Sequence, residues 1–141
     1  MDTAPLLALA LGRRCAVFLP RILDYRHRRM AFVPPGPRQQ LNRYGIAEFT
    51  GNHRNAPWTM QIVFLPLVGF DTRGNRLGMG AGFYDRALAF RRRRRHWRGP
   101  LLVGIAHSSQ QTPLIEPLAT DIPLDAVVTE RGIHVFRGDS P

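Results

Sequence analysis

The sequence predicts an α/β fold, a three-layer sandwich in which a mixed, mostly parallel sheet is flanked by helices. Residues 61–66 and 101–106 are short apolar runs of strand length, and the second has an apolar residue or glycine at every position. A strand that is apolar on both faces is typical of the interior of a parallel sheet. Between these runs, apolar side chains spaced by three and four predict a helix over 83–95. Strands alternating with helices form such layers.

The region before residue 61 predicts shorter elements. Proline and glycine at 34–37 exclude ordinary helix and central strand, so an irregular loop is expected to follow. In the expected helix at the N-terminus, Leu6, Leu7, Ala10 and Leu11 share one face, and Gly12 is expected to cap its end. The expected elements are a helix over 3–11, a buried strand over 15–19 closed by Pro20, a charged loop over 21–28, a strand over 30–33 and a loop to about residue 57.

The C-terminal part predicts a long loop and a hairpin. Residues 107–124 contain three prolines and are expected to form a loop. The segments 127–129 and 133–136 are short and apolar, and Glu130, Arg131 and Gly132 separate them. This pattern predicts a hairpin at the edge of the sheet. In open α/β sheets, ligands bind beyond the carboxyl ends of the strands, where the 107–124 loop is expected to emerge.

Composition indicates a single intracellular domain. A chain of 141 residues is long enough for one domain with its own core, and we expect 1–141 to form one. The single cysteine, Cys15, excludes an internal disulfide and fits a reducing compartment. The apolar stretch 4–11 is far shorter than the roughly 20 residues of a membrane helix, and Asp2 stands where a signal peptide is basic. We therefore expect a cytoplasmic protein without membrane contact.

The net charge of +10 comes from arginines, most visibly the run Arg91–Arg95. Such a charge balance suits nucleic acid binding, which is one hypothesis. The sequence shows no zinc spacing, repeat or RNA-binding signature with interleaved aromatic residues. A basic run at the end of a helix is more often a solvated face, and its charge suits a helix C-terminus. We favour that interpretation and do not expect a nucleic-acid partner.

The glycine-rich segment 74–86 carries the strongest functional signal. It follows a predicted strand and leads into a predicted helix, a geometry whose backbone N–H groups bind phosphate. Arg76 adds positive charge, and the carboxylate of Asp85 is suited to magnesium. From the residues alone, a plain turn and a dipole-complementing Asp85 remain alternatives. The spacing fits neither the Walker loop nor the Rossmann fingerprint.

The same segment resembles the signature of 5-formyltetrahydrofolate cyclo-ligases, also called methenyltetrahydrofolate synthetases. The resemblance runs from about Asp2 to Phe136 and places the expected sandwich among Rossmann-like folds of the NagB/RpiA/CoA-transferase type. The family segments are 65–71 and 74–86, with further matches at 42–46, 102–106, 110–111 and 121–129.

The resemblance implies an ATP- and Mg2+-dependent ring closure of 5-formyltetrahydrofolate to 5,10-methenyltetrahydrofolate, with release of ADP and phosphate. It implies catalytic roles for Arg76 and Asp85, and magnesium ligation by Asp85 and Asp125. Carried over by position, the ATP-binding residues are Arg76, Leu77, Gly78, Met79, Gly80, Ala81, Gly82, Phe83 and Tyr84. The expected folate contacts are Met79, Gly80, Ala81, Gly82, Phe83 and Tyr44.

Other candidates have alternatives of equal weight. Tyr44 and Trp58 suit stacking on a pterin, and each also suits packing in the core. Gln110 and Gln111 suit hydrogen bonds to pterin or phosphate, and also an ordinary polar loop. For Asp125 the residues alone favour a turn or the start of a strand. The expected partners are 5-formyltetrahydrofolate and ATP, bound by a monomer.

The sequence also departs from the family pattern. Family members carry a further N-terminal segment with a basic helix and a first strand, and this chain is expected to lack it, as a truncated product or through a misplaced start. It contains no lysine. Met79 and Ala81 stand where some relatives are basic, and Phe83 replaces a tyrosine. A nucleotide- or folate-binding remnant without turnover is therefore the alternative to an active enzyme.

Overall fold

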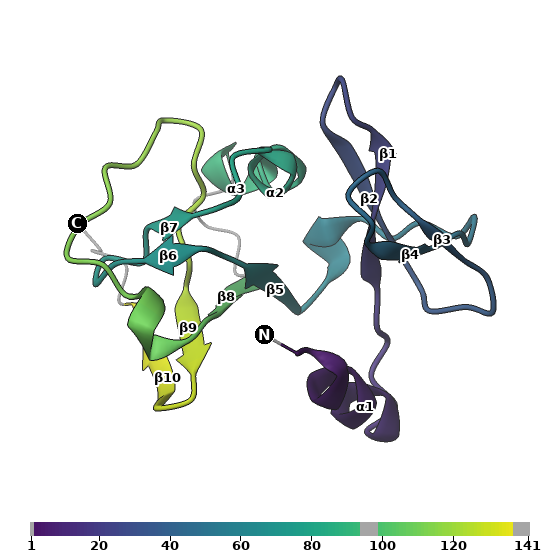
Figure 1. The fold of residues 1–141 in the computed structure, drawn as a ribbon, viewed down its shortest axis with the longest axis horizontal. Coiled ribbons are helices and arrows are strands. Elements are labelled where there is room, and N and C mark those ends of the chain that lie inside the picture. Colours follow the sequence, from purple (N-terminus) through teal and green to yellow (C-terminus); the bar gives the residue numbers. More distant parts are fainter. Residues whose placement is uncertain (1, 94–98, 137–141) are drawn as a thin grey trace. The chain divides into compact units, whose positions relative to one another are not determined.

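The computed structural model describes residues 2–93 and 99–136 of the chain (Figure 1). The chain divides into two compact units, 1–56 and 57–141. The single domain over 1–141 stays a prediction. None of the helices in the described ranges is long and apolar enough to cross a membrane.

The first unit contains one helix and two hairpins. Helix α1 spans Ala4–Gly12. Strands β1 (Leu19–Asp24) and β2 (Arg29–Val33) pair antiparallel, as do β3 (Gln39–Leu41) and β4 (Ala47–Phe49). Its buried side chains are Ala31, Phe32, Val33 and Glu48.

The predicted bounds of the first strand were wrong, and so was the predicted cap of the N-terminal helix. The first strand begins at Leu19 rather than Cys15, which is exposed, and it continues through Asp24 into the expected charged loop. Pro20 lies inside the strand, opposite Phe32, because β1 pairs with β2 alone among the described strands and proline is tolerated on an edge strand. Helix α1 is confirmed, but Gly12 is its last residue and Arg13 its cap.

The β3–β4 hairpin was missed, since the sequence indicated an irregular loop. Its strands are three residues long and largely exposed, so they carry no apolar alternation. A buried carboxylate holds the region instead. Glu48 accepts hydrogen bonds from the backbone N–H of Ile22 at 3.1 Å and from Asn42 Nδ2 at 2.8 Å. The strand prediction over 30–33 was confirmed by β2.

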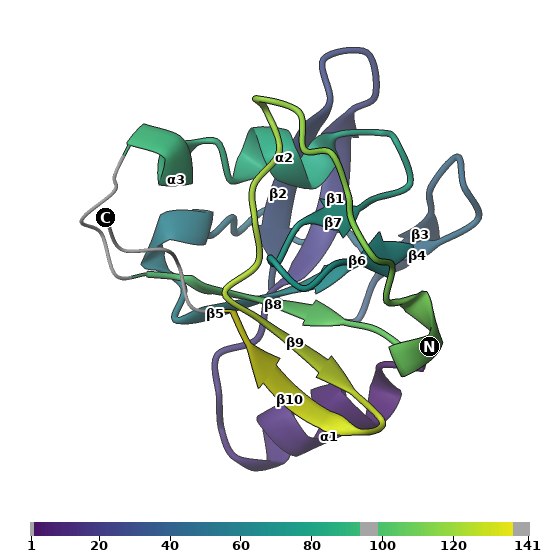
Figure 2. The ribbon, with the colours of Figure 1, turned by 90° about the vertical axis from the view of Figure 1, so that its left-hand side faces the viewer.

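The second unit is built on a four-stranded sheet (Figure 2). Its strand order is β10-β9-β8-β5, with β5 (Ile62–Pro66) parallel to β8 (Leu101–Ile105) and β8 parallel to β9 (Ala126–Thr129). Strand β10 (Gly132–Val135) pairs antiparallel with β9 at the edge. The mixed, mostly parallel sheet and the edge hairpin are therefore confirmed. The strand register places Leu65, Leu102 and Val127 on one face of the sheet, and all three are fully buried.

Two short helices lie on one side of the sheet (Figure 2). Helix α2 spans Phe83–Ala87 and α3 spans Phe90–Arg93, so the single helix predicted over 83–95 is wrong within the described residues, and 94–95 lie outside them. Between the helices the hydrogen bonds follow the 3-10 pattern, in which each N–H donates to the carbonyl three residues earlier. Ala89 N–H donates to Arg86 O, and Arg91 N–H donates to Leu88 O. The side chain of Leu88 is fully buried at this break.

Four short elements lie next to the strands of the sheet along the chain. Strands β6 (Gly69–Phe70) and β7 (Arg76–Leu77) form a small hairpin after β5. Short 3-10 turns, η1 (Pro57–Thr59) and η2 (Ser108–Gln110), precede β5 and follow β8.

Gly104 in β8 provides a test of the packing. A Cβ at this position would lie 2.7 Å from Leu67 Cδ2 and 2.8 Å from Leu124 Cδ1. We expect Gly104→Ala to lower the free energy of unfolding by about 1–3 kcal/mol, because overpacking forces the neighbours from their rotamers. Denaturant unfolding measures this change. Gly51→Ala is the control, since its Cβ would meet nothing within 4 Å, and an equal loss in both variants would contradict the prediction.

Candidate functional site

The turn between β6 and β7 is organised by the buried carboxylate of Asp71. Its Oδ1 accepts the backbone N–H groups of Arg73 and Asn75, both at 2.9 Å. Its Oδ2 accepts Asn75 Nδ2 at 2.9 Å and Ile115 N–H at 3.0 Å. Burial acts to raise the pKa of Asp71, but these hydrogen bonds outweigh it and hold the pKa below its usual value. The carboxylate is therefore ionised and joins the turn to the 107–124 loop.

Gly74 completes this turn. Its φ of +84° lies in the left-handed region, and a Cβ there would approach Leu124 O to 2.9 Å. The carbonyl of Gly74 also accepts the N–H of Leu124 at 2.9 Å. Glycine is required at this position both by backbone conformation and by the close approach of the later loop.

The segment Gly78–Gly82 forms an exposed loop between β7 and α2. Gly80 and Gly82 have φ of +80° and +68°, and Met79 is 89% exposed. In the described part of the chain, none of the five backbone N–H groups of this loop donates a hydrogen bond. Successive free N–H groups in such conformations form an anion-binding concavity. Because α2 has only five residues, the loop itself, more than a helix dipole, supplies this property.

Arg76 and Asp85 form an ion pair beside the loop. Arg76 NH2 lies 2.5 Å from Asp85 Oδ1, which also accepts the N–H of Ile122 at 3.3 Å. The Arg76 side chain is only 4% exposed, and that of Asp85 is 23% exposed. A Cβ on Gly78 would lie 3.2 Å from Arg76 NH1, so the guanidinium lies directly against the loop. The pair places a cation under the loop and a carboxylate at the start of α2.

Phe83 and Tyr84, the two aromatic residues after the loop, differ in how deeply they are buried. Phe83 is buried. Tyr84 is half-buried, and burial raises the pKa of its phenol to about 12, against the opposing effect of the Arg76 guanidinium. The hydroxyl therefore stays protonated at neutral pH and serves as a neutral hydrogen-bonding group.

Asp125 lies in a separate ion pair. Its Oδ1 and Oδ2 lie 2.9 and 3.0 Å from Arg91 NH2, and Oδ2 also accepts the N–H of Leu102 at 2.7 Å. Its own backbone N–H donates to Leu102 O. Asp125 is thus held at the amino-terminal end of β8. Asp85 and Asp125 share no partner among these contacts, although Asp85 reaches Ile122, three residues before Asp125.

Asp85 and Asp125 are not equally suited to bind a magnesium ion. No group of three or more potential metal-binding His, Cys, Asp or Glu side chains occurs among the described residues. Magnesium is commonly held by one or two carboxylates together with substrate phosphates. Asp85 fits that pattern, since it lies in the first turn of α2, directly after the glycine loop, and is partly exposed. Both oxygens of Asp125 are already engaged, so it fits only if Arg91 moves away.

Comparison with known proteins identifies the family. The family model described as the 5-formyltetrahydrofolate cyclo-ligase family matches residues 1–130. The chain belongs to this family. A 5-formyltetrahydrofolate cyclo-ligase of Haemophilus influenzae is 37% identical over 115 residues, which cover 77% of this chain and 58% of the relative. One from Escherichia coli strain K12 is 35% identical over 133 residues, covering 92% of this chain and 71% of the relative. The chain thus spans little more than half of the first relative.

Solved structures of cyclo-ligase relatives share the fold. The 5,10-methenyltetrahydrofolate synthetase of Aquifex aeolicus has a TM-score of 0.75 and 29% identity, over 100% of this chain and 68% of that one. A 5,10-methenyltetrahydrofolate synthetase from Mycoplasma pneumoniae has a TM-score of 0.64 over 90% of this chain and 63% of that one, at 20% identity, which shows the fold alone.

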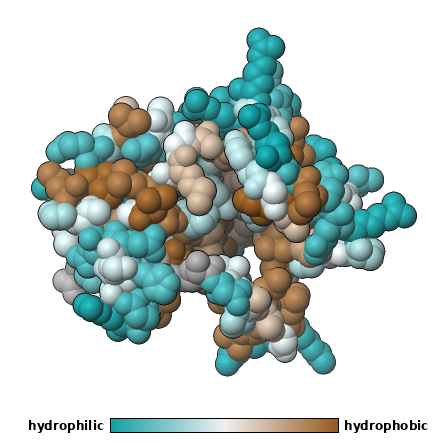
Figure 3. Space-filling model, in the orientation of Figure 1, coloured by the Kyte–Doolittle hydropathy of each residue, from teal (hydrophilic) through white to brown (hydrophobic). Residues whose placement is uncertain are grey.

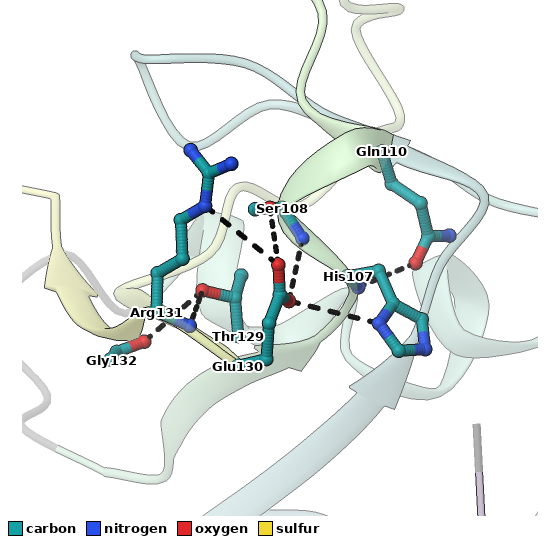
Figure 4. Close-up of polar contacts among 7 residues, drawn as sticks. All are labelled: His107, Ser108, Gln110, Thr129, Glu130, Arg131 and Gly132. Carbon is teal, nitrogen blue, oxygen red and sulfur yellow. Dashed lines mark hydrogen bonds and ion pairs between the residues drawn. The ribbon is translucent and has the colours of Figure 1, made fainter.

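A polar cluster at the carboxyl ends of the strands was not foreseen (Figure 4). Ser108 donates from its N–H, at 2.9 Å, and from its hydroxyl to the carboxylate of Glu130, just after β9. The Ser108 hydroxyl and backbone are the main causes that lower the pKa of Glu130 to about 2. His107 Nδ1 lies 3.7 Å from the same carboxylate.

Gln110, a candidate ligand contact, belongs to this cluster. Its Nε2 donates to Leu67 O and Val68 O, each at 3.1 Å, and its Oε1 accepts the His107 N–H at 2.7 Å. Its side chain is therefore engaged in joining η2 to the end of β5. Gln111 pairs through its backbone with Phe70, and the N–H of Thr112 donates to Phe70 O.

The other aromatic candidates, Tyr44 and Trp58, belong to different units. Tyr44 belongs to the first unit and is 54% exposed. Trp58 is 47% exposed, and its ring packs edge-on against Phe90 with centroids 5.9 Å apart. Their roles in folate binding stay predictions.

Protonation of Asp71 should weaken the fold. Because its folded pKa is lowered, its contribution is fully present above the unfolded value near 3.8 and is lost as the pH falls through the folded pKa. We expect the free energy of unfolding to decrease below that pH in the native sequence. In Asp71→Asn this part of the pH dependence should disappear. Denaturant unfolding from pH 7 to below the unfolded pKa measures the difference, and parallel pH profiles would contradict the assignment.

At neutral pH, Asp71→Asn should lower the free energy of unfolding by about 2–4 kcal/mol, because the amide group cannot accept all four hydrogen bonds. The matched control is Glu116→Gln, because Glu116 is exposed in the 107–124 loop. This substitution should change the free energy of unfolding little. Chemical denaturation of both variants gives the comparison. A small effect at Asp71 would show that the turn does not depend on it.

Proposed function

We propose that this protein catalyses the ATP- and magnesium-dependent cyclisation of 5-formyltetrahydrofolate to 5,10-methenyltetrahydrofolate, with release of ADP and phosphate. Family membership and the free backbone N–H groups of Gly78–Gly82 support this proposal. A loop that presents several donors without bulky side chains suits the phosphates of ATP. The proposal includes a cytoplasmic, monomeric enzyme.

The reaction requires activation of a formyl group. The formyl oxygen takes the terminal phosphoryl group of ATP, and ADP leaves. The second folate nitrogen then attacks the activated carbon, the ring closes, and phosphate departs with the former formyl oxygen. No protein nucleophile is needed, so catalysis rests on positioning and charge neutralisation.

In this proposal the loop holds the phosphates and Arg76 acts from beneath it. The buried guanidinium contributes positive potential where negative charge accumulates, and its pairing with Asp85 fixes its orientation. Asp71 and Gly74 act indirectly, since they set the turn from which the loop rises. Tyr84 remains a neutral donor beside Arg76.

Asp85 would hold the magnesium ion, and Asp125 would join it if Arg91 moved away. When bound, magnesium neutralises and orients the phosphates. Both carboxylates are satisfied by arginines in this structure, which also suits the alternative of a binding remnant without turnover. Activity measurement separates the two.

The native chain should produce methenyltetrahydrofolate absorbance when mixed with 5-formyltetrahydrofolate, ATP and magnesium. We expect Asp85→Asn to lower kcat/KM by about 100-fold or more, because a lost metal ligand removes several kcal/mol of transition-state stabilisation. Glu116→Gln should keep the native rate. Calorimetric binding of ATP without product by the native chain would support the remnant and contradict the enzyme.

A double variant separates catalysis from stability. Asp85→Asn alone leaves the buried Arg76 without its counter-ion and should destabilise the fold by about 2–4 kcal/mol. Adding Arg76→Gln removes the unpaired charge and should restore part of that stability while activity stays lost. Thermal unfolding and the absorbance assay measure both effects. Recovery of activity in the double variant would contradict the proposed roles.

A further inference from the structure

The first unit brings together two tyrosines that lie 19 positions apart in the sequence. Tyr25 lies in the β1–β2 turn and Tyr44 in the β3–β4 turn, and their ring centroids are 5.7 Å apart at an interplanar angle of 65°. The backbone N–H of Arg43 donates to the Tyr25 hydroxyl at 3.1 Å. The Arg43 guanidinium lies 4.8 Å from the Tyr25 centroid and 5.6 Å from that of Tyr44. The two turns therefore form one aromatic and cationic cluster.

The surroundings of this cluster are strongly basic. Arg26 and Arg28 follow Tyr25 in the same turn, and both are exposed. The first unit contains nine arginines and three carboxylates. Glu48 is buried, and Asp24 is engaged by the His27 backbone at 2.9 Å and by its ring at 2.7 Å. The tip of the β1–β2 hairpin is hydrophilic on the visible face (Figure 3).

We propose that the basic aromatic patch binds single-stranded nucleic acid with little sequence preference. The basic aromatic patch consists of Tyr25, Arg26, Arg28, Arg43 and Tyr44. The half-exposed Tyr44 ring offers a surface on which an unpaired base stacks, and the arginines contact the adjoining phosphates. The argument for this function rests on the patch itself and does not require the cyclisation proposed above, although Tyr44 is also a predicted folate contact.

The chemistry of the patch favours a single strand over other polyanions. A duplex keeps its base faces stacked, and an acidic peptide lacks bases, so neither uses the rings in this way. The arginines account for electrostatic attraction, and Tyr44 adds a contribution that a purely charged surface lacks. The two contributions respond differently to salt and to mutation.

Fluorescence anisotropy of a labelled oligonucleotide of about 12 nucleotides tests the proposal with the full chain. RNA and DNA strands are titrated separately at several salt concentrations. We expect binding at low salt that weakens steeply as salt rises, because phosphate contacts release counterions. In the double variant Arg26→Gln with Arg28→Gln, the slope of log affinity against log salt concentration should become less steep by about one to two. Tyr44→Ala should lower affinity about 5- to 100-fold with the slope unchanged.

The matched control is Arg13→Gln with Arg14→Gln. It removes the same charge as the patch variant, also from exposed positions. The match extends to the backbone, since Arg14 (φ +56°) and Arg28 (φ +52°) both have the left-handed conformation. Circular dichroism of each variant verifies folding. The control should change affinity and slope much less than the patch variant. Absence of binding at low salt, equal effects of the two arginine pairs, an inert Tyr44→Ala, or equal competition by poly-glutamate would each overturn the proposal.

Discussion

The buried carboxylate of Asp71 is the interaction on which the architecture of the second unit most depends. It accepts four hydrogen bonds and so joins a turn to residue 115, more than forty positions later in the chain. The carbonyl of Gly74 then accepts a hydrogen bond from the N–H of Leu124, in the loop that also carries Ile122. Without that turn, neither the Arg76–Asp85 pair nor the glycine loop would have a fixed starting point.

Arginine–carboxylate pairs then fix the helices over the sheet. The Arg76–Asp85 pair ties α2 to β7, and the Arg91–Asp125 pair ties α3 to the residue just before β9. Arg92 adds a bond to Thr120 O at 2.5 Å. Arg91 is therefore held in a structural ion pair, whereas Arg92 and Arg93 are exposed, as expected for a solvated face. Residues 94–95 of the run lie outside the described part of the chain.

The sequence predicted the parts of the fold that depend on apolar patterning. The strands around Val63, Leu102 and Val127 were recognisable because they are apolar and bounded by turns. The β3–β4 hairpin was not, since it is held by the buried Glu48 and not by an apolar face. The break at Leu88 was not predicted either, since the apolar spacing continues across it, and the partners of Arg91 and Arg92 lie 34 and 28 positions away in the sequence.

The candidate site was predictable to a similar extent. The glycines and Asp85 were identified by pattern and resemblance, and the structure places Gly78 and Asp85 beside Arg76. The Asp71 turn was detectable in principle, because Asp71 followed by Gly74-Asn75 is typical turn chemistry. The Ser108–Glu130 contact joins residues 22 positions apart, and no local signal points to it.

The parallel pairing of β5 with β8 also has a consequence for synthesis on the ribosome. Ile62 pairs with Leu101, and Val103 pairs with Ala126, so each strand waits for a partner that is translated later. Until then, the apolar side chains of β5 have no sheet to enter, and such non-local pairing folds slowly. The nascent chain therefore passes through an interval in which the apolar side chains of β5 are exposed without a partner strand.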